Sequence, residues 1–262
     1  MAEITASMVK ALREETGQGM MECKKALTEC NGDVEAAKDL LRQKGLVKAE
    51  KKAERETSEG LVRIRVNGDN TVATIVELKC ETDFCSRNDE FQAMADKVAD
   101  LATDAPAGDI PASDEMTTLV QDCFAKIGEN MSYGRGVKLE GAKVGHYLHH
   151  DNKTGVIVAV DQVADEDLLR KVCQHIAFAD PMGITEADLP ADLLEKESEF
   201  AKQEAIDSGK NEEIAEKMVV GKMKKFVAQH ALMDQAFIHD DKKSVREILG
   251  GATVTGFARF KL

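Results

Sequence analysis

The feature that most constrains this chain is a diverged internal duplication. The segment "EGLVRIRVNGDNTVATIVEL", which begins at Glu59, matches "EGAKVGHYLHHDNKTGVIVAV", which begins at Glu140. Each copy predicts two apolar strands joined at an Asp-Asn turn, followed by a helix that ends near a proline. Because one hairpin with one helix cannot bury its own sheet, the repeat predicts an α+β core of antiparallel strands and helices built from two such units.

The two copies differ in the connection between the second strand and the helix. The turn residues Asn70 and Asn152 are 82 positions apart, whereas Pro106 and Pro181, which follow the helices, are 75 positions apart. The first copy is therefore seven residues longer here, and the surplus lies in "KCETDFCSRNDEF", residues 79–91. A connection that is extended in one copy alone is a candidate functional loop.

Phe84 is the unusual residue of this loop. It stands between Asp83 and Cys85, outside any apolar period, and Phe91 already supplies the apolar residue at the start of the next helix. A core residue folded back beneath the loop is one interpretation, and the sequence leaves it open. We favour an interface anchor on a projecting loop, because exposed aromatic side chains commonly carry binding energy.

Residues 1–55 predict a three-helix module and a linker. Thr5 can cap the first helix, "TGQG" at 16–19 and "NGD" at 31–33 separate the helices, and Gly45 is expected to end the third. The charged segment 47–60, "VKAEKKAERETSEG", is expected to be a linker without regular structure.

We assign residues 56–139 to the first core repeat and 140–262 to the second. A further helix is expected over 113–129, and "ATVTGFARFKL" at 252–262 predicts a closing strand. Residues 188–229, roughly, predict an inserted antiparallel helical hairpin. Its expected seam places three residues of the first helix against three of the second: Leu194, Ala201 and Ala205 against Ile214, Met218 and Gly221.

Charge and composition limit the possible functions. The formal net charge of −13 argues against direct binding of nucleic acid, which needs a basic surface. No apolar run approaches the roughly 20 residues that span a bilayer, so no membrane segment is expected. With six cysteines and no secretory signal, we expect reduced thiols and a cytoplasmic location.

Metal and catalytic motifs are weak. Cys80 and Cys85 form one marginal pair, whereas a structural zinc site needs two such pairs. A metal-dependent enzyme that uses His146, His149 and His150 is the alternative, but no HExxH, GxSxG or Walker motif accompanies them, and "SYGRGV" at 132–137 lacks the lysine of a phosphate loop. We therefore expect no bound metal, no cofactor, no direct nucleotide binding and no catalytic chemistry.

Two motifs give the chain a specific resemblance. "ITASMVKALREETGQGMMECKKALTECNGDVEAAKDLLRQKG", followed later by "ETDF" after a strand, resembles the bacterial elongation factor Ts family, and the likeness covers essentially the whole chain. It implies a translation factor that binds elongation factor Tu with GDP and promotes GDP release until GTP rebinds. In that family the TDF segment reaches into the GTPase domain and disturbs its magnesium and phosphate site, which here involves Thr82, Asp83, Phe84 and Cys85.

The resemblance also implies further partner contacts. The N-terminal module resembles the ubiquitin-associated fold and would contact the GTPase domain; an adaptor built on this module alone is a third possible function. The matching positions in the N-terminal part are Arg13, Met20, Met21, Lys24 and Lys52, and those in the second repeat are Tyr147 and His149.

The chain departs from the family pattern at several positions. Cys85 stands where valine is usual, "HHDN" replaces a glycine-containing "HG" turn, and "QAF" at 235–237 replaces "QPF". A helix commonly follows the last strand in the family, and its contact here is either missing or lies beyond Leu262, where this sequence ends. In some members the hairpin makes dimer contacts, so a dimer is also possible here.

Overall fold

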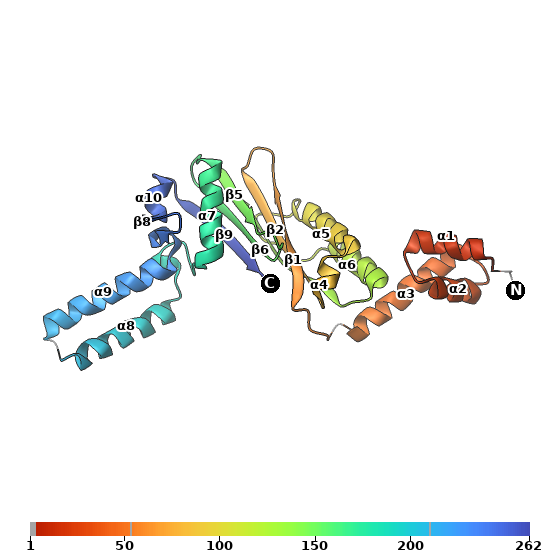
Figure 1. The fold of residues 1–262 in the computed structure, drawn as a ribbon, viewed down its shortest axis with the longest axis horizontal. Helices are drawn as coiled ribbons and strands as arrows, with labels where there is room; N and C mark the ends of the chain where they lie inside the picture. The colour runs from red at the N-terminus through yellow and green to blue at the C-terminus, as the bar shows by residue number, and fades with distance from the viewer. Residues whose placement is uncertain (1–3, 53, 210) are drawn as a thin grey trace. The chain divides into compact units, whose positions relative to one another are not determined.

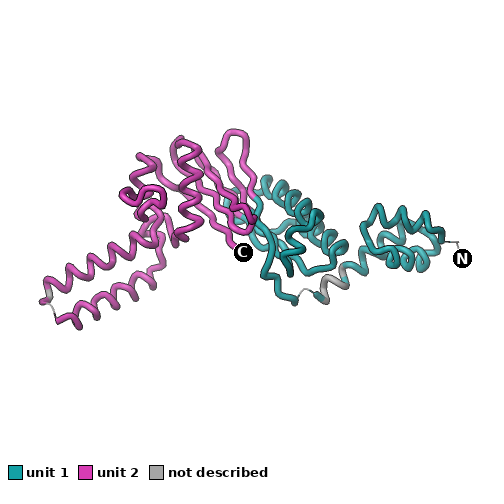
Figure 2. Tube along the Cα trace, viewed as in Figure 1, with its two compact units in different colours: residues 1–63, 76–136, 262 teal, residues 64–75, 137–261 magenta. Residues whose placement is uncertain are grey.

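The computed structural model describes residues 4–52, 54–209 and 211–262, and it confirms an α+β fold (Figure 1). The chain forms two compact units (Figure 2). Unit 1 comprises Met1–Arg63, Val76–Gly136 and Leu262, and unit 2 comprises Ile64–Ile75 and Val137–Lys261. Within the described ranges, no helix is long and apolar enough to cross a membrane.

The N-terminal module contains α1 (Ala6–Thr16), α2 (Met20–Glu29) and α3 (Val34–Lys52). The Thr5 hydroxyl accepts a hydrogen bond from the Met8 amide, as expected of an N-cap. The three helices bury a small common core made of Val9, Leu12, Cys23, Ala26, Leu27, Ala37 and Leu41. The predicted three-helix module is confirmed.

The predicted end of the third helix at Gly45 is wrong. α3 continues to Lys52, so the expected linker over 47–60 is helical in its first part. A Cβ atom on Gly45 would lie 3.2 Å from the Cβ of Ala125, so glycine allows α3 to approach the later helix α6 (Asp114–Ile127) closely. This contact, together with good helix formers after Gly45, outweighs the roughly 1 kcal/mol helix cost of glycine.

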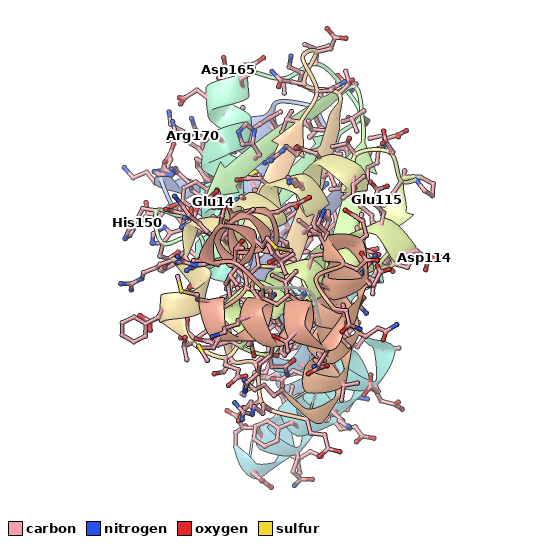
Figure 3. All side chains as sticks on the ribbon, turned by 90° about the vertical axis from the view of Figure 1, so that its right-hand side faces the viewer. Glu14, Asp114, Glu115, His150, Asp165 and Arg170 are labelled. Carbon is pink, nitrogen blue, oxygen red and sulfur yellow. The ribbon has the colours of Figure 1, made fainter. Side chains whose placement is uncertain are left out.

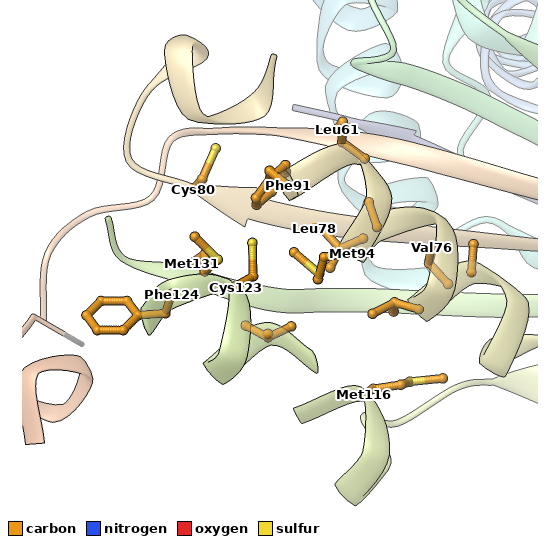
Figure 4. Close-up of a cluster of buried hydrophobic side chains, with 14 of the residues drawn as sticks. Leu61, Val76, Leu78, Cys80, Phe91, Met94, Met116, Cys123, Phe124 and Met131 are labelled. Carbon is orange, nitrogen blue, oxygen red and sulfur yellow. The ribbon is translucent and has the colours of Figure 1, made fainter. Parts of the chain in front are cut away.

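The first repeat contributes most of a four-stranded sheet with the order β1-β2-β4-β3. Its strands are β1 (Glu59–Val66), β2 (Val72–Cys80), β3 (Gly108–Asp109) and β4 (Met131–Glu140). α5 (Asp89–Ala102) and α6 pack on it and enclose Leu78, Phe91 and Met94 (Figure 4). The helix predicted over 113–129 is confirmed, with its first-turn carboxylates exposed (Figure 3).

The second repeat contributes β5 (Lys143–Leu148) and β6 (Thr154–Val160), and β9 (Val254–Lys261) pairs antiparallel with β6. The predicted closing strand is therefore confirmed. α7 (Glu166–Ala179) begins after its N-cap Asp165 (Figure 3). It packs on this three-stranded sheet. Gly145 allows close packing, because a Cβ there would lie 2.6 Å from Leu169.

The hairpin turns of the two repeats share one backbone conformation. Asn70 and Asn152 both adopt left-handed backbone conformations, with φ of 53° and 58°. Asparagine tolerates this region better than most residues because its short polar side chain bonds locally. Short elements complete the second repeat, namely the 3-10 turns at Glu186–Asp188 and Leu232–Asp234, β7 (Ala236–Phe237), β8 (Asp240–Ser244) and α10 (Val245–Leu249).

The inserted hairpin consists of α8 (Ala191–Asp207) and α9 (Glu212–His230). Ala201 and Ala205 are buried, as the seam prediction required. The same prediction is wrong for Ile214, which is 44% exposed, and for Gly221, whose missing Cβ would have no neighbour within 4 Å. The seam is narrow, and both residues lie on the solvent-facing side of α9.

A candidate partner-binding prong after strand β2

The connection that is longer in the first repeat forms a capped helical turn. α4 (Asp83–Ser86) follows β2, and the Thr82 hydroxyl accepts a hydrogen bond from the Cys85 amide at 3.2 Å. The Ser86 hydroxyl donates to the Asp83 carbonyl at 3.0 Å, and Arg87 forms an ion pair with Asp83 at 3.2 Å. We call residues 81–87 the prong. The segment expected to be a loop therefore contains a short ordered helix with its own N-cap.

Two neighbouring side chains of the prong differ in exposure, because one faces solvent and the other faces the core. Phe84 is 81% exposed, whereas Cys85 is 2% exposed and belongs to the same buried cluster as Phe91. Successive residues of a helix are about 100° apart, so one turn can both anchor itself and present a ring to solvent. The interpretation of Phe84 as a core residue is wrong. Cys85, predicted as a contact residue, is a buried anchor instead.

The two thiols at the base of the prong are buried. The Cys80 thiol donates to the Thr82 carbonyl at 3.2 Å. A hydrogen bond with Cys80, together with burial, raises the pKa of the Cys85 thiol well above its ordinary value. The six cysteines are free thiols, and no group of three or more metal-ligating side chains gathers among the described residues. The base of the prong is accordingly a packed core.

A second set of contacts ties the prong to the junction between α6 and β4. The Thr82 hydroxyl donates to the Glu129 carboxylate, with oxygen separations of 2.9 and 3.1 Å. The Asn130 amide donates to the Glu81 carboxylate at 2.5 Å, and Arg55 approaches the same carboxylate at 3.3 Å. The Asn130 amide, and secondarily Arg55, hold the pKa of Glu81 below its ordinary value.

The sequence interpretation missed Glu81, Glu129 and Asn130. Glu81 directly precedes the TDF segment, so its position beside Thr82 was the one available signal. Glu129 lies 47 residues further along the chain from Thr82, and no local pattern predicts that separation. Contacts of this kind depend on the tertiary fold.

In the N-terminal module, most predicted contact residues lie on an accessible surface. Met20 and Met21, in the first turn of α2, are 54% and 64% exposed, and Arg13 and Lys24 are exposed as well. Large apolar side chains at the surface are typical of binding sites when they occur together. Met20, Met21 and Lys24 share one helix, and Arg13 lies on the preceding one.

Lys52 differs from the other predicted contact residues. Its ammonium group donates to the Gly128 carbonyl at the end of α6 and lies 6.0 Å from the centroid of the Phe124 ring. A lysine at the C-terminal end of a helix interacts favourably with the helix dipole. Lys52 therefore has a defined intramolecular role, because its charged group contacts residues of its own chain.

The predicted residues of the second repeat meet at the end of β5. The Tyr147 hydroxyl lies 2.7 Å from His149 Nδ1, and the His149 and His150 rings are 4.2 Å apart between centroids. Burial, followed by the charge of Arg170, lowers the pKa of His146. Tyr147 packs against the core of its sheet, so the hydrogen bond to its hydroxyl gives His149 a fixed position beside the turn.

Comparison with known proteins identifies the family. Residues 81–262 match the protein-family model described as elongation factor TS. Elongation factor Ts of Pasteurella multocida (strain Pm70) is 48% identical over 269 residues, covering 100% of this chain and 93% of that protein. For elongation factor Ts of Salmonella agona (strain SL483), the identity is 45% over 269 residues, covering 100% and 92%. The chain belongs to the elongation factor Ts family.

Proposed function

We propose that this chain is a translation elongation factor that acts as a guanine-nucleotide exchange factor for elongation factor Tu. Its family membership supports this function, and the observation that carries the mechanism is the exposed ring of Phe84 on an ordered, capped turn. An exchange factor needs no catalytic group of its own, because it acts by preferring one state of its partner. Phe84, with Thr82 and Asp83, enters the partner's GTPase domain.

The energetic requirement is a coupling between two ligands of the partner. If the exchange factor binds nucleotide-free elongation factor Tu more tightly than the GDP form, linkage requires that it weakens GDP binding by the same factor. A magnesium ion is a large local charge in a phosphate site. A ring that displaces the residues around this ion is therefore an effective way to weaken the binding of GDP. GTP then rebinds and releases the exchange factor.

The other exposed surfaces would hold the partner while the ring acts. Met20, Met21, Lys24 and Arg13 offer a mixed apolar and basic surface on the N-terminal module, and the half-buried His149 offers one further contact in the second repeat. Attachment at separate places raises the effective concentration of Phe84 at its site without any new contact there. Loss of the Met20 and Met21 side chains should therefore weaken binding rather than abolish the maximal rate.

The release of a fluorescent GDP analogue from elongation factor Tu tests this function. Phe84→Ala should slow the accelerated release at least tenfold at a saturating concentration of the exchange factor. Phe178→Ala is the matched control, because Phe178 on α7 is also 81% exposed, and it should leave the rate unchanged. Equal rates for the Phe84 variant and the wild type would contradict the mechanism.

We further propose that the helical hairpin mediates self-association. Phe200, Ile206 and Val220 are 68%, 67% and 69% exposed on its two helices. Sedimentation velocity of the wild type and of Phe200→Ser tests this: a dimer that the substitution dissociates supports the proposal, and a wild-type monomer at tens of micromolar contradicts it.

A further inference from the structure

The hydroxyl of Thr82 links the prong to the α6–β4 junction. It accepts the Cys85 amide hydrogen at 3.2 Å and donates its own hydrogen to the Glu129 carboxylate at 2.9 Å. A hydroxyl has one hydrogen to donate, so the carboxylate determines where that hydrogen points and leaves a lone pair for the cap. The resulting chain runs from the Cys85 amide through Thr82 to Glu129.

Glu129 is itself held by rigid neighbours. Gly128 ends α6 in a left-handed conformation with φ of 81°, and its amide donates to the Phe124 carbonyl at 2.7 Å. Met131 begins β4, and Phe124 and Met131 are both buried in the cluster that contains Cys85. The carboxylate therefore approaches the prong from a fixed part of the fold, and a charged acceptor makes the bond stronger than one between neutral groups.

A second hydrogen bond joins the prong to the α6–β4 junction, and here the junction supplies the donor and the prong the acceptor. The Asn130 amide donates to the Glu81 carboxylate at 2.5 Å, and the Asn130 side chain donates to the Arg55 carbonyl at 2.7 Å. Residues 81–82 and residues 129–130 thus each donate a hydrogen bond to the other pair. Together with the buried Cys85 side chain, these two bonds fix the direction of the turn.

We propose that Glu129 is a positioning residue for nucleotide exchange, because its bond to Thr82 fixes the direction in which α4 presents Phe84. This inference rests on the proposed exchange function. Phe84 is 81% exposed and so receives little support from its own packing. Its direction is set at the base of α4, and a ring that must enter a partner's site loses efficiency when its support can rotate.

The test is the release of a fluorescent GDP analogue from elongation factor Tu at increasing concentrations of the exchange factor. Glu129→Ala should lower the maximal release rate about tenfold, the size of effect expected for one hydrogen bond to a charged group. The half-saturating concentration should change less than about twofold, because the exposed surfaces elsewhere are intact. Glu129→Gln should recover most of the rate, since its amide oxygen can accept the same hydroxyl hydrogen.

Three further variants complete the experiment. Thr82→Val removes the hydroxyl and should lower the maximal rate at least as much as Glu129→Ala, and the double variant should be no slower than Thr82→Val alone. Glu115→Ala removes an exposed carboxylate at the other end of α6 and should behave as the wild type. Circular dichroism melting confirms that each variant is folded.

The outcomes separate this inference from the proposed function. Wild-type protein that fails to accelerate GDP release overturns the exchange function itself. An active wild type with equally active Glu129→Ala overturns the positioning role alone. An equal loss in Glu129→Gln and Glu129→Ala overturns it too, because charge rather than the hydrogen bond would then matter. A raised half-saturating concentration at an unchanged maximal rate identifies Glu129 as a partner contact instead, which also contradicts the inference.

Discussion

Two phenylalanines seven residues apart should respond to the same substitution in opposite ways. Phe84 is 81% exposed on the prong, and Phe91 is completely buried at the start of α5. We expect Phe84→Ala to slow nucleotide exchange at least tenfold and to leave the free energy of unfolding almost unchanged. Phe91→Ala should strongly reduce that free energy.

The burial of each ring gives the expected magnitudes. A fully buried phenylalanine removes about 150–250 Å² from water, and large-to-small substitution of such a residue costs about 3–5 kcal/mol, including the cavity that remains. Roughly a fifth of that area, about 40 Å², is covered at Phe84. At about 25 cal/mol per Å² this corresponds to about 1 kcal/mol, which is an upper bound because the unfolded chain also covers some surface.

Urea unfolding followed by far-ultraviolet circular dichroism measures both variants, a suitable method because the chain contains no tryptophan. Phe84→Ala should keep the midpoint and slope of the wild type within error, and Phe91→Ala should lower the midpoint clearly. A loss of 3 kcal/mol or more in Phe84→Ala would refute the reasoning, because it would place the ring in a packed environment within its own chain. Equal losses in the two variants would do the same.

Three further predictions concern other parts of the chain. Gly221→Ala should raise the free energy of unfolding by about 0.5–1 kcal/mol in thermal melts, because the new methyl meets nothing within 4 Å, whereas Gly145→Ala should lower it. Burial lowers the pKa of His175, and Nδ1 of its neutral ring accepts the Ile238 amide hydrogen. The stability contributed by the neutral ring is therefore complete above the unfolded pKa of about 6.5. This stability is lost as the pH falls through the lower pKa of the folded state. The drop in melting temperature between pH 7.5 and 5.5 should therefore be smaller in His175→Gln; an equal drop would assign the pH dependence to other groups. Cys85→Val should change stability by less than about 1.5 kcal/mol and leave GDP release unaltered, since a buried apolar side chain of similar size replaces the thiol; a large loss of exchange would show that the thiol itself matters.

Local signals in the sequence were sufficient for much of the fold. The cap at Thr5 and the turns at Asn70 and Asn152 each depend on a few neighbouring residues. Backbone preferences of this kind act in the unfolded chain as well as in the folded one, so they can be predicted without knowledge of the tertiary structure.

The features that the sequence did not predict depend on distant contacts. Because α3 and α6 pack together, Gly45 stays helical beside Ala125. For the same reason, the Lys52 ammonium group contacts the Gly128 carbonyl at the end of α6. The contact between Thr82 and Glu129 joins two segments in the same way. Only Phe84 was predicted from a mismatch between repeats, which is itself a comparison over long range.

The second repeat is an internal control for the prong. There β6 ends at Val160 and α7 begins at Glu166, with Asp165 capping the Leu168 amide at 2.9 Å and no helical turn between strand and helix. The strand still pairs on both sides, and α7 still buries its apolar face. The strand–helix unit therefore closes without a prong, so the fold does not require α4. Phe84 therefore lies on a capped turn that the second repeat does without, and this supports the proposed contact of its exposed ring with a partner.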